Sequence, residues 1–327
     1  MAVFLGGAML DDILFCINAI LPIFILMVLG YFLMRIKLIN ETFVNVADKF
    51  VFKVALPAMI FNNVANSNFS TDFNPRLSAF VLVAIFACFI VITAIASASI
   101  KKRDVRGAFV QAVFRSNFAI LGLPVAGNLF GEAGTVGATL LFPFVIPLYN
   151  VLAVITLATN MPANEKKSKL SYACSVVKSI VTNPLNISVV LGLPFAFSLL
   201  NMPSVIDSGI HYLSDLSTPL ALISLGASFK FSSLKGNIGY ALGATLTKLL
   251  AVPITVRGLG ILCGFRGVDL GLLLIVFGTP TAVSSYIMAK EMKSNGALAG
   301  QIVMLSTLLC SVTLLVGTFL LKNLGLI

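Results

Sequence analysis

Long apolar segments separated by short polar ones make up almost the whole chain. A helix needs about 20 apolar residues to cross the hydrocarbon core of a bilayer. By this criterion the pattern predicts ten membrane-spanning helices, at residues 13–34, 43–65, 77–99, 106–128, 133–158, 182–200, 205–229, 237–261, 267–288 and 297–321. The longest polar stretch, MPANEKKSK, lies near the middle of the chain. The predicted fold class is therefore an all-α polytopic membrane protein.

The composition supports this prediction. Hydrophobic residues make up 58% of the 327 residues and charged residues 10%, whereas soluble domains are about 45–50% apolar and about 25% charged. The chain opens with MAVFLGGAMLDD, which lacks the basic region of a cleavable signal peptide, and the apolar run that follows is long enough to span. We therefore expect a multi-pass protein of the cell membrane, in contact with the lipid bilayer.

The net charge of +10 does not predict nucleic-acid binding, because the basic residues are dispersed over several loops. Cytoplasmic loops carry the excess of Lys and Arg, so the loops rich in these residues are expected to be cytoplasmic and both termini extracytoplasmic. The sparse set of loops contains only Arg76, Arg266 and Lys322. The rich set contains Arg35, Lys37, Lys101, Lys102, Arg103, Arg106, Lys166, Lys167, Lys169, Lys178, Lys230, Lys235, Lys290 and Lys293.

The two halves of the chain share an order of prolines, glycines and basic residues. The offset between matched positions falls slowly from 162 to 156 along the pairs Pro22/Pro184, Gly30/Gly192, Pro57/Pro219, Arg106/Arg266 and Pro124/Pro280. The match predicts a repeat at residues 1–158, a cytoplasmic linker with an amphipathic segment at 159–181, and a second repeat at 182–327. Because each repeat holds five spans, the second copy enters the membrane inverted, a plan that recurs in secondary transporters.

A glycine and a proline interrupt both the fourth and the ninth predicted spans. Gly122-Leu123-Pro124 and Gly278-Thr279-Pro280 occupy corresponding positions. Proline removes a backbone donor and clashes with the carbonyl four residues back, and in lipid such freed groups must be buried in protein or line a wet cavity. We therefore expect two crossed broken helices with a substrate site at the Pro124/Pro280 crossing.

Polar side chains near these breaks are candidate substrate ligands: Ser116 and Asn117 before Pro124, and Thr279, Thr281, Ser284 and Ser285 around Pro280. The hydroxyl groups have an alternative role, because Ser and Thr often bond the backbone of their own helix. Asn117 differs, since one helix cannot satisfy all the hydrogen bonds of an amide.

Ionisable residues inside membrane spans are functional candidates by default. Lys248 lies near the centre of the eighth span, and could be a fixed positive charge in place of a coupling sodium ion or a group linked to protons. Arg115 and Lys53 are candidates for coupling or charge compensation, although the side chain of either could extend to the membrane surface.

Other chemistry has little support in the sequence. The five cysteines form no CxxC pair, and His211 is the single histidine, so we expect no metal and no cofactor. The hydrolase motifs GxSxG and HExxH do not occur, so an enzyme is not expected.

Three segments resemble one transporter family. FRSNFAILGLPVAGNLFGEAG (114–134), STPLALISLGASF (217–229) and TPTAVSSYIMA (279–289), followed by LAGQIVMLSTLLCSVTLL (298–315), are similar to the fourth, seventh, ninth and tenth spans of the auxin efflux carrier family. This family contains the plant PIN proteins and bacterial relatives such as malate and malonate permease-like carriers. The long central hydrophilic loop of many plant members is missing here, so the chain resembles a compact bacterial member.

The resemblance implies two inverted five-helix repeats, as in sodium/proton antiporters and bile-acid symporters. It implies a scaffold from residues 13–65 and 182–229 and a mobile transport domain from 77–158 and 237–321. It also implies elevator-type transport of small organic anions such as malate, malonate or auxin-like acids, and a homodimer. By motif position, Asn117 and the Pro124/Pro280 crossing match the binding centre, and Asn62, Asn63 and Ser224 match the scaffold side. Two alternatives stay open: a sodium-coupled symporter of the bile-acid type, and a non-transporting membrane sensor.

Overall fold

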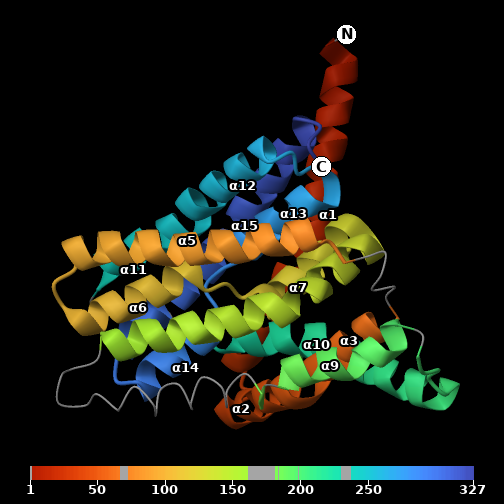
Figure 1. Ribbon diagram of the computed structural model, residues 1–327, viewed down its shortest axis with the longest axis horizontal. Helices are drawn as coiled ribbons and strands as arrows, with labels where there is room; N and C mark the ends of the chain where they lie inside the picture. The colour runs from red at the N-terminus through yellow and green to blue at the C-terminus, as the bar shows by residue number, and fades with distance from the viewer. Residues whose placement is uncertain (1, 67–72, 161–180, 183, 198, 230–236) are drawn as a thin grey trace.

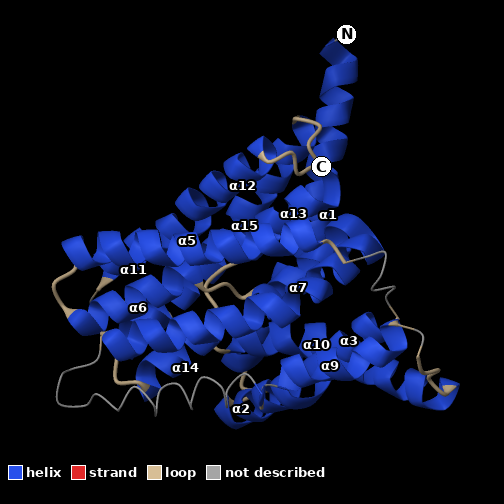
Figure 2. Ribbon diagram, in the orientation of Figure 1, coloured by secondary structure: helices blue, strands red, loops and turns tan. Residues whose placement is uncertain are grey.

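Every regular element that the computed structural model describes is helical (Figure 2). The structure describes residues 2–66, 73–160, 181–182, 184–197, 199–229 and 237–327. Most of the predicted linker 159–181, including its amphipathic segment and its lysines, lies outside the described residues, as do residues 230–236. Within the described part the prediction of an all-α protein is confirmed.

The described residues form sixteen helical segments, three of which are short π-helical turns. In chain order they are α1 (Ala2–Arg35), α2 (Glu41–Phe50), η1 (Val51–Ala55), α3 (Leu56–Ala65), α5 (Pro75–Ser99), α6 (Arg103–Phe114), η2 (Phe118–Gly122), α7 (Leu123–Thr159), α9 (Pro184–Ala196), α10 (Ser204–Ala227), α11 (Ile238–Leu246), η5 (Thr247–Ala251), α12 (Val252–Leu262), α13 (Gly267–Gly278), α14 (Ser284–Glu291) and α15 (Gly296–Asn323).

Several of these helices can cross a membrane. Among the described residues, five stretches are long and apolar enough: Leu14–Arg35, Pro75–Ser99, Phe118–Thr159, Ile238–Leu262 and Gly296–Asn323. Two shorter helices, α9 and α13, are also apolar. The chain is therefore a multi-pass membrane protein.

The three π-helical turns share one local cause. Each is followed directly by an α-helix whose second residue is a proline: Pro57 after η1, Pro124 after η2 and Pro253 after η5. A proline cannot donate to the carbonyl four residues back and its ring crowds that carbonyl. The wider π-helical turn gives the carbonyl room without ending the helix.

Gly131 divides the long helix α7 into two. Its φ of 61° and ψ of −140° lie outside the helical region, so the chain turns sharply there. A residue with a Cβ rarely adopts this conformation, whereas glycine does so at little cost. The turn falls between the predicted spans 106–128 and 133–158, which are thus two helices and not one.

The helices pack into two groups (Figure 1). In one group α10 packs against α1, α2 and α3, and α9 packs against α3. In the other, α6 packs against α5 and α7, α13 against α7 and α12, and α15 against α11, α14 and α6. Helices α1 and α7 also connect the two groups, through the contacts of α1 with α7 and α15 and of α7 with α3 and α9.

Glycines allow the closest helix contacts of the first group. A Cβ on Gly226 of α10 would overlap the carbonyl oxygen of Met27, and one on Gly30 of α1 would overlap that of Ile223. A Cβ on Gly192 of α9 would lie 2.9 Å from the Cβ of Val64 on α3. Small residues at such positions let membrane helices approach to backbone contact.

Candidate functional site

Two helices break inside the protein and their broken ends meet. Between α6 and η2 the backbone is extended at Arg115 and Ser116, and between α13 and α14 it leaves the helix at Thr279. Ser116 and Thr281 form an isolated antiparallel β-bridge, and the main-chain nitrogen of Asn117 donates to the carbonyl oxygen of Pro280 at 2.7 Å. Loop segments in Figure 2 accordingly lie within the helical body, beside α6 and α7.

The break in the fourth predicted span is not where the sequence placed it. Gly122, Leu123 and Pro124 lie in continuous helix, at the junction of η2 and α7, and the chain is unwound before them, at Arg115–Asn117. The Leu123 amide donates to the carbonyl of Phe118, which is the bond of a π-helical turn. Gly122 serves close packing, because a Cβ there would lie 2.5 Å from Cδ2 of Phe118 and 3.2 Å from Cγ2 of Ile275. Pro280 lies within the second break, at the position that the sequence indicated.

Hydroxyl groups satisfy much of the backbone that the two breaks release. Oγ1 of Thr281 donates to the carbonyl of Ala112 at 2.7 Å, and the Thr281 amide donates to Oγ of Ser306 at 3.1 Å. Oγ of Ser116 donates to the carbonyl of Thr279 at 3.2 Å and also contacts Oγ1 of Thr279. The hydroxyls of Ser116 and Thr281 therefore bond across the crossing, which fixes the two extended segments to each other. The hydroxyl of Ser306 also donates to the carbonyl of Val303 on its own helix at 3.2 Å.

Two buried donors at the crossing have no hydrogen-bond partner among the described residues. They are Nδ2 of Asn117, in a side chain that is 4% exposed, and Oγ of Ser285, in one that is 1% exposed. Leaving such a group unsatisfied costs about 1–3 kcal/mol, so each buried donor of this kind needs an explanation. A ligand bound at the crossing would supply one. Ser284, next to Ser285 at the start of α14, is half-buried.

Arg115 brings a positive charge to the crossing. The side chain is 8% exposed, so it does not extend to the membrane surface. One guanidinium nitrogen donates to Oδ1 of Asn150 at 2.8 Å and another approaches the sulfur of Met288 at 2.6 Å. Neither partner is a carboxylate, so within the described part of the chain no negative charge neutralises Arg115.

Lys248 is a second buried cation close to the same elements. It lies on η5, has no exposed surface, and its Nζ has no hydrogen-bond partner within the described residues. The turn η5 packs against α6 and α13, which lead into the two breaks, and against α15. Lys53 occupies the comparable π-helical turn η1 but is exposed. Of the two lysines, only Lys248 is enclosed by protein.

The three predicted residues of the scaffold side do not bond to the crossing. Asn62 accepts from Asn66, the residue that follows its own helix α3, and Asn63 donates weakly to Thr139 of α7 at 3.4 Å. Ser224 is fully buried and donates to the carboxylate of Asp48. These contacts stabilise the packing of α2, α3, α7 and α10.

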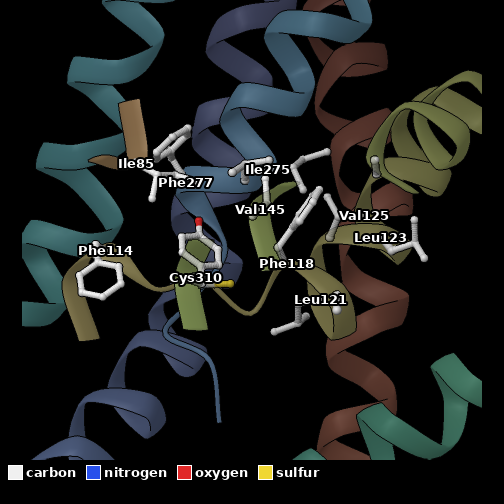
Figure 3. Close-up of a cluster of buried hydrophobic side chains, with 14 of the residues drawn as sticks. Ile85, Phe114, Phe118, Leu121, Leu123, Val125, Val145, Ile275, Phe277 and Cys310 are labelled. Atoms are coloured by element: carbon white, nitrogen blue, oxygen red, sulfur yellow. The ribbon is translucent and has the colours of Figure 1, made fainter. Parts of the chain in front are cut away.

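Apolar side chains enclose the crossing (Figure 3). Phe114 and Phe118 flank the extended segment, and Phe118 packs edge-on against Phe142 with ring centroids 5.0 Å apart. Phe277 and Ile275 of α13 lie in the same cluster. The crossing is thus a polar centre in a low-dielectric surrounding, where charge interactions are strong.

The described residues also form a cavity of about 380 Å³ away from the crossing. It lies between α5, α7 and α13, and Asn74, Ser78, Glu132 and Asp269 give its wall polar character. Asn74 donates to Asp269 at 2.8 Å. These acidic residues are separate from Asn117 and Arg115, neither of which lines the cavity.

Sequence reasoning missed Ser306 and Asn150, which bond to the crossing segments. Asn150 could have been found, because an amide inside an apolar span rarely lacks a partner. Ser306 could not, since its role depends on the contact between α15 and the second break.

Known proteins similar to this chain are membrane transporters. The family model described as membrane transport protein matches residues 15–318. An uncharacterized transporter of Methanocaldococcus jannaschii is 25% identical over 83% of this chain and 87% of its own length. An uncharacterized transporter of Methanothermobacter thermautotrophicus is 25% identical over 91% and 95%, and the uncharacterized transporter YfdV of Escherichia coli is 24% identical over 85% and 88%.

Proposed function

Because this chain belongs to the membrane transport protein family, we propose that it is a secondary active transporter of small organic anions, with its substrate site at the crossing of the two broken helices. The substrates are carboxylates such as malate, malonate or auxin-like acids. The observation that carries the proposal is a set of buried polar groups. The donors of Asn117, Ser285 and Lys248 have no partner among the described residues, and no carboxylate neutralises Arg115. A carboxylate would supply the acceptors and the negative charge that this set lacks.

The proposed architecture is ten spans in two inverted repeats. The packing supports it, because the first span, α1, packs on the seventh, α10, and the sixth span, α9, packs on the second, which contains α3. These contacts correspond if the repeat equates the first span with the sixth and the second with the seventh. Gly30 and Gly192, which the repeat equates, both lie at these contacts. Each half also contains one broken helix, one between α6 and η2 and one between α13 and α14.

The proposed mechanism is elevator-type movement of one helix group against the other. The group of α5, α6, α7 and α11–α15 contains both broken helices and would carry the anion, with Pro280 at the crossing and Pro124 at the start of α7. The group of α1, α2, α3, α9 and α10 would form the scaffold and the homodimer contact. In this proposal both termini lie outside the cytoplasm, which the excess of Lys and Arg in the opposite set of loops supports. The proposed location is a cell membrane of bacterial inner-membrane type.

Sodium-coupled symport on the same fold is the second candidate. Sodium sites use oxygen ligands, usually with a carboxylate. The described side chains at the crossing supply amide and hydroxyl groups together with two cations, a set suited to an anion. A membrane sensor would bind the anion but not move it, so a transport measurement separates it from a carrier.

Counterflow in proteoliposomes tests the proposal. Vesicles loaded with unlabelled malate, malonate or indole-acetate are diluted into the same labelled anion, and uptake is followed over time. We expect exchange of at least one anion and its loss in Asn117→Ala. Asn323→Ala is the matched control, since Asn323 is an exposed amide at the end of α15. Equal exchange in Asn117→Ala and Asn323→Ala contradicts the assignment of the site.

A further inference from the structure

Lys248 is a buried amine that no described residue neutralises. Its side chain has no exposed surface and its Nζ has no hydrogen-bond partner in the part of the chain that the structure describes. An ammonium ion removed from water without a partner is strongly unfavourable, and a buried lysine escapes this cost by releasing its proton. In the absence of an added negative charge, burial therefore disfavours the ammonium form compared with a lysine in water.

The groups around Lys248 do not supply that negative charge. Its electrostatic neighbours are the thiols of Cys88 on α5 and Cys310 on α15, and Cys310 is completely buried. Among the other titratable or charged groups on the surrounding elements, Arg257 lies in the middle of α12. The rest lie in terminal turns of their helices: Arg76 on α5, Arg103, Asp104 and Arg106 on α6, Tyr240 on α11, Asp269 on α13 and Lys322 on α15.

Lys248 also lies against the elements that form the crossing. The turn η5 packs on α6, which ends at Arg115, on α13, which ends at Thr279, and on α15, which provides Ser306. The spacing of 160 residues from Cys88 to Lys248 equals that from Arg106 to Arg266. The two side chains that interact here therefore occupy equivalent positions in the proposed repeats.

Arg115 cannot take the same role. A guanidinium group keeps its proton in proteins, and that of Arg115 has partners in Asn150 and Met288. Arg115 is thus a fixed charge at the crossing, whereas the amine of Lys248 can gain and lose a proton.

We propose that Lys248 is the proton-binding residue of the carrier, which takes up a proton when the anion binds at the crossing and releases it when the anion leaves. This inference rests on the proposed function. In the loaded state the lone pair of the amine holds a proton from solution, and the ammonium offsets one carboxylate. In the empty state the amine is neutral, so Lys248 adds no second charge to that of Arg115 in the low-dielectric interior. Each anion then moves together with one proton.

The direction of the pH effect follows from linkage. If the anion favours the protonated amine, protonation favours the anion by the same factor. Affinity for the anion is therefore highest at low pH and falls as pH rises, by at most tenfold per pH unit for a single proton.

Calorimetry in buffers of different ionisation enthalpy tests the proposal, because it counts the protons taken up when malate or malonate binds to the purified protein at about pH 8. We expect up to one proton per anion in the wild type and none in Lys248→Met. Lys248→Arg, which is permanently charged, is expected to bind the anion without proton uptake and with little pH dependence. The matched control Lys49→Met, at an exposed lysine of α2, should match the wild type.

Two results overturn the proposal. One is anion binding to the wild type without proton uptake, and the other is undiminished proton uptake in Lys248→Met and Lys248→Arg. Counterflow on the same preparation separates the proposed role of Lys248 from the proposed transport function. Anion exchange without proton uptake removes the role of Lys248 and leaves the carrier, whereas the absence of both exchange and binding removes both.

Discussion

The main-chain nitrogen of Asn117 donates to the carbonyl oxygen of Pro280 at 2.7 Å, which joins two broken helices from opposite halves of the chain. Together with the β-bridge between Ser116 and Thr281, this bond satisfies backbone groups that neither helix can satisfy alone. Because the pairing uses the backbone of Asn117, its side-chain amide remains available.

Replacing Asn117 by alanine should separate activity from stability. We expect at least a tenfold loss of anion exchange, because the proposed ligand is removed. The free energy of unfolding should not fall, because Nδ2 is buried without a partner and relief of such a group is worth about 1–3 kcal/mol. Labelled-anion exchange and thermal unfolding in detergent check both parts, and a lower Tm in Asn117→Ala would mean that the amide is structural.

A comparison of Thr281 with Thr318 tests whether the hydroxyl of Thr281 stabilises the backbone at the crossing. Both are fully buried, but Oγ1 of Thr281 donates to the carbonyl of Ala112 whereas Oγ1 of Thr318 has no partner. Thr281→Val should destabilise the protein by about 1–3 kcal/mol, since it leaves a buried carbonyl unsatisfied. Thr318→Val should be neutral or stabilising. Equal shifts of Tm in the two variants would contradict the role given to Thr281.

Gly226 tests the contact between α1 and α10. A Cβ at this position would overlap the carbonyl of Met27, so Gly226→Ala should force the two helices apart and cost about 1–3 kcal/mol. Gly258 in α12 has open space at the same place, and Gly258→Ala should stabilise by about 0.5–1 kcal/mol. Opposite shifts of Tm are the expected result, and a stable Gly226→Ala would show that the contact is looser than described.

The sequence predicted long helices well and their interruption less well. The span predicted at 297–321 corresponds to α15, and that at 77–99 to α5, because apolar length alone determines both. The break expected at Gly122–Pro124 lies instead at Arg115–Asn117. A π-helical turn accommodates Pro124 locally, whereas the extended segment depends on pairing with Pro280 and Thr281, a tertiary contact that the local sequence does not encode.

Some residues of the candidate site could be predicted, because polar side chains are unusual inside membrane spans. An amide at Asn117 and a lysine at position 248 stand out in apolar spans, and the structure buries both side chains. The role of Ser306 depends on which helix faces the second break, and the burial of Arg115 depends on Asn150 and Met288. These contacts between distant segments cannot be read from local pattern.

Alternating access to Ser285 tests the central claim most directly. Ser285 is 1% exposed, and its hydroxyl has no partner in the described structure. In a cysteine-free background, Ser285→Cys is reacted with a membrane-impermeant maleimide from either side of the membrane, with and without the transported anion. The account predicts labelling from both sides and slower labelling when the anion is present. A cysteine that reacts from one side only, or at a rate that the anion does not change, would contradict a carrier whose anion site is this crossing.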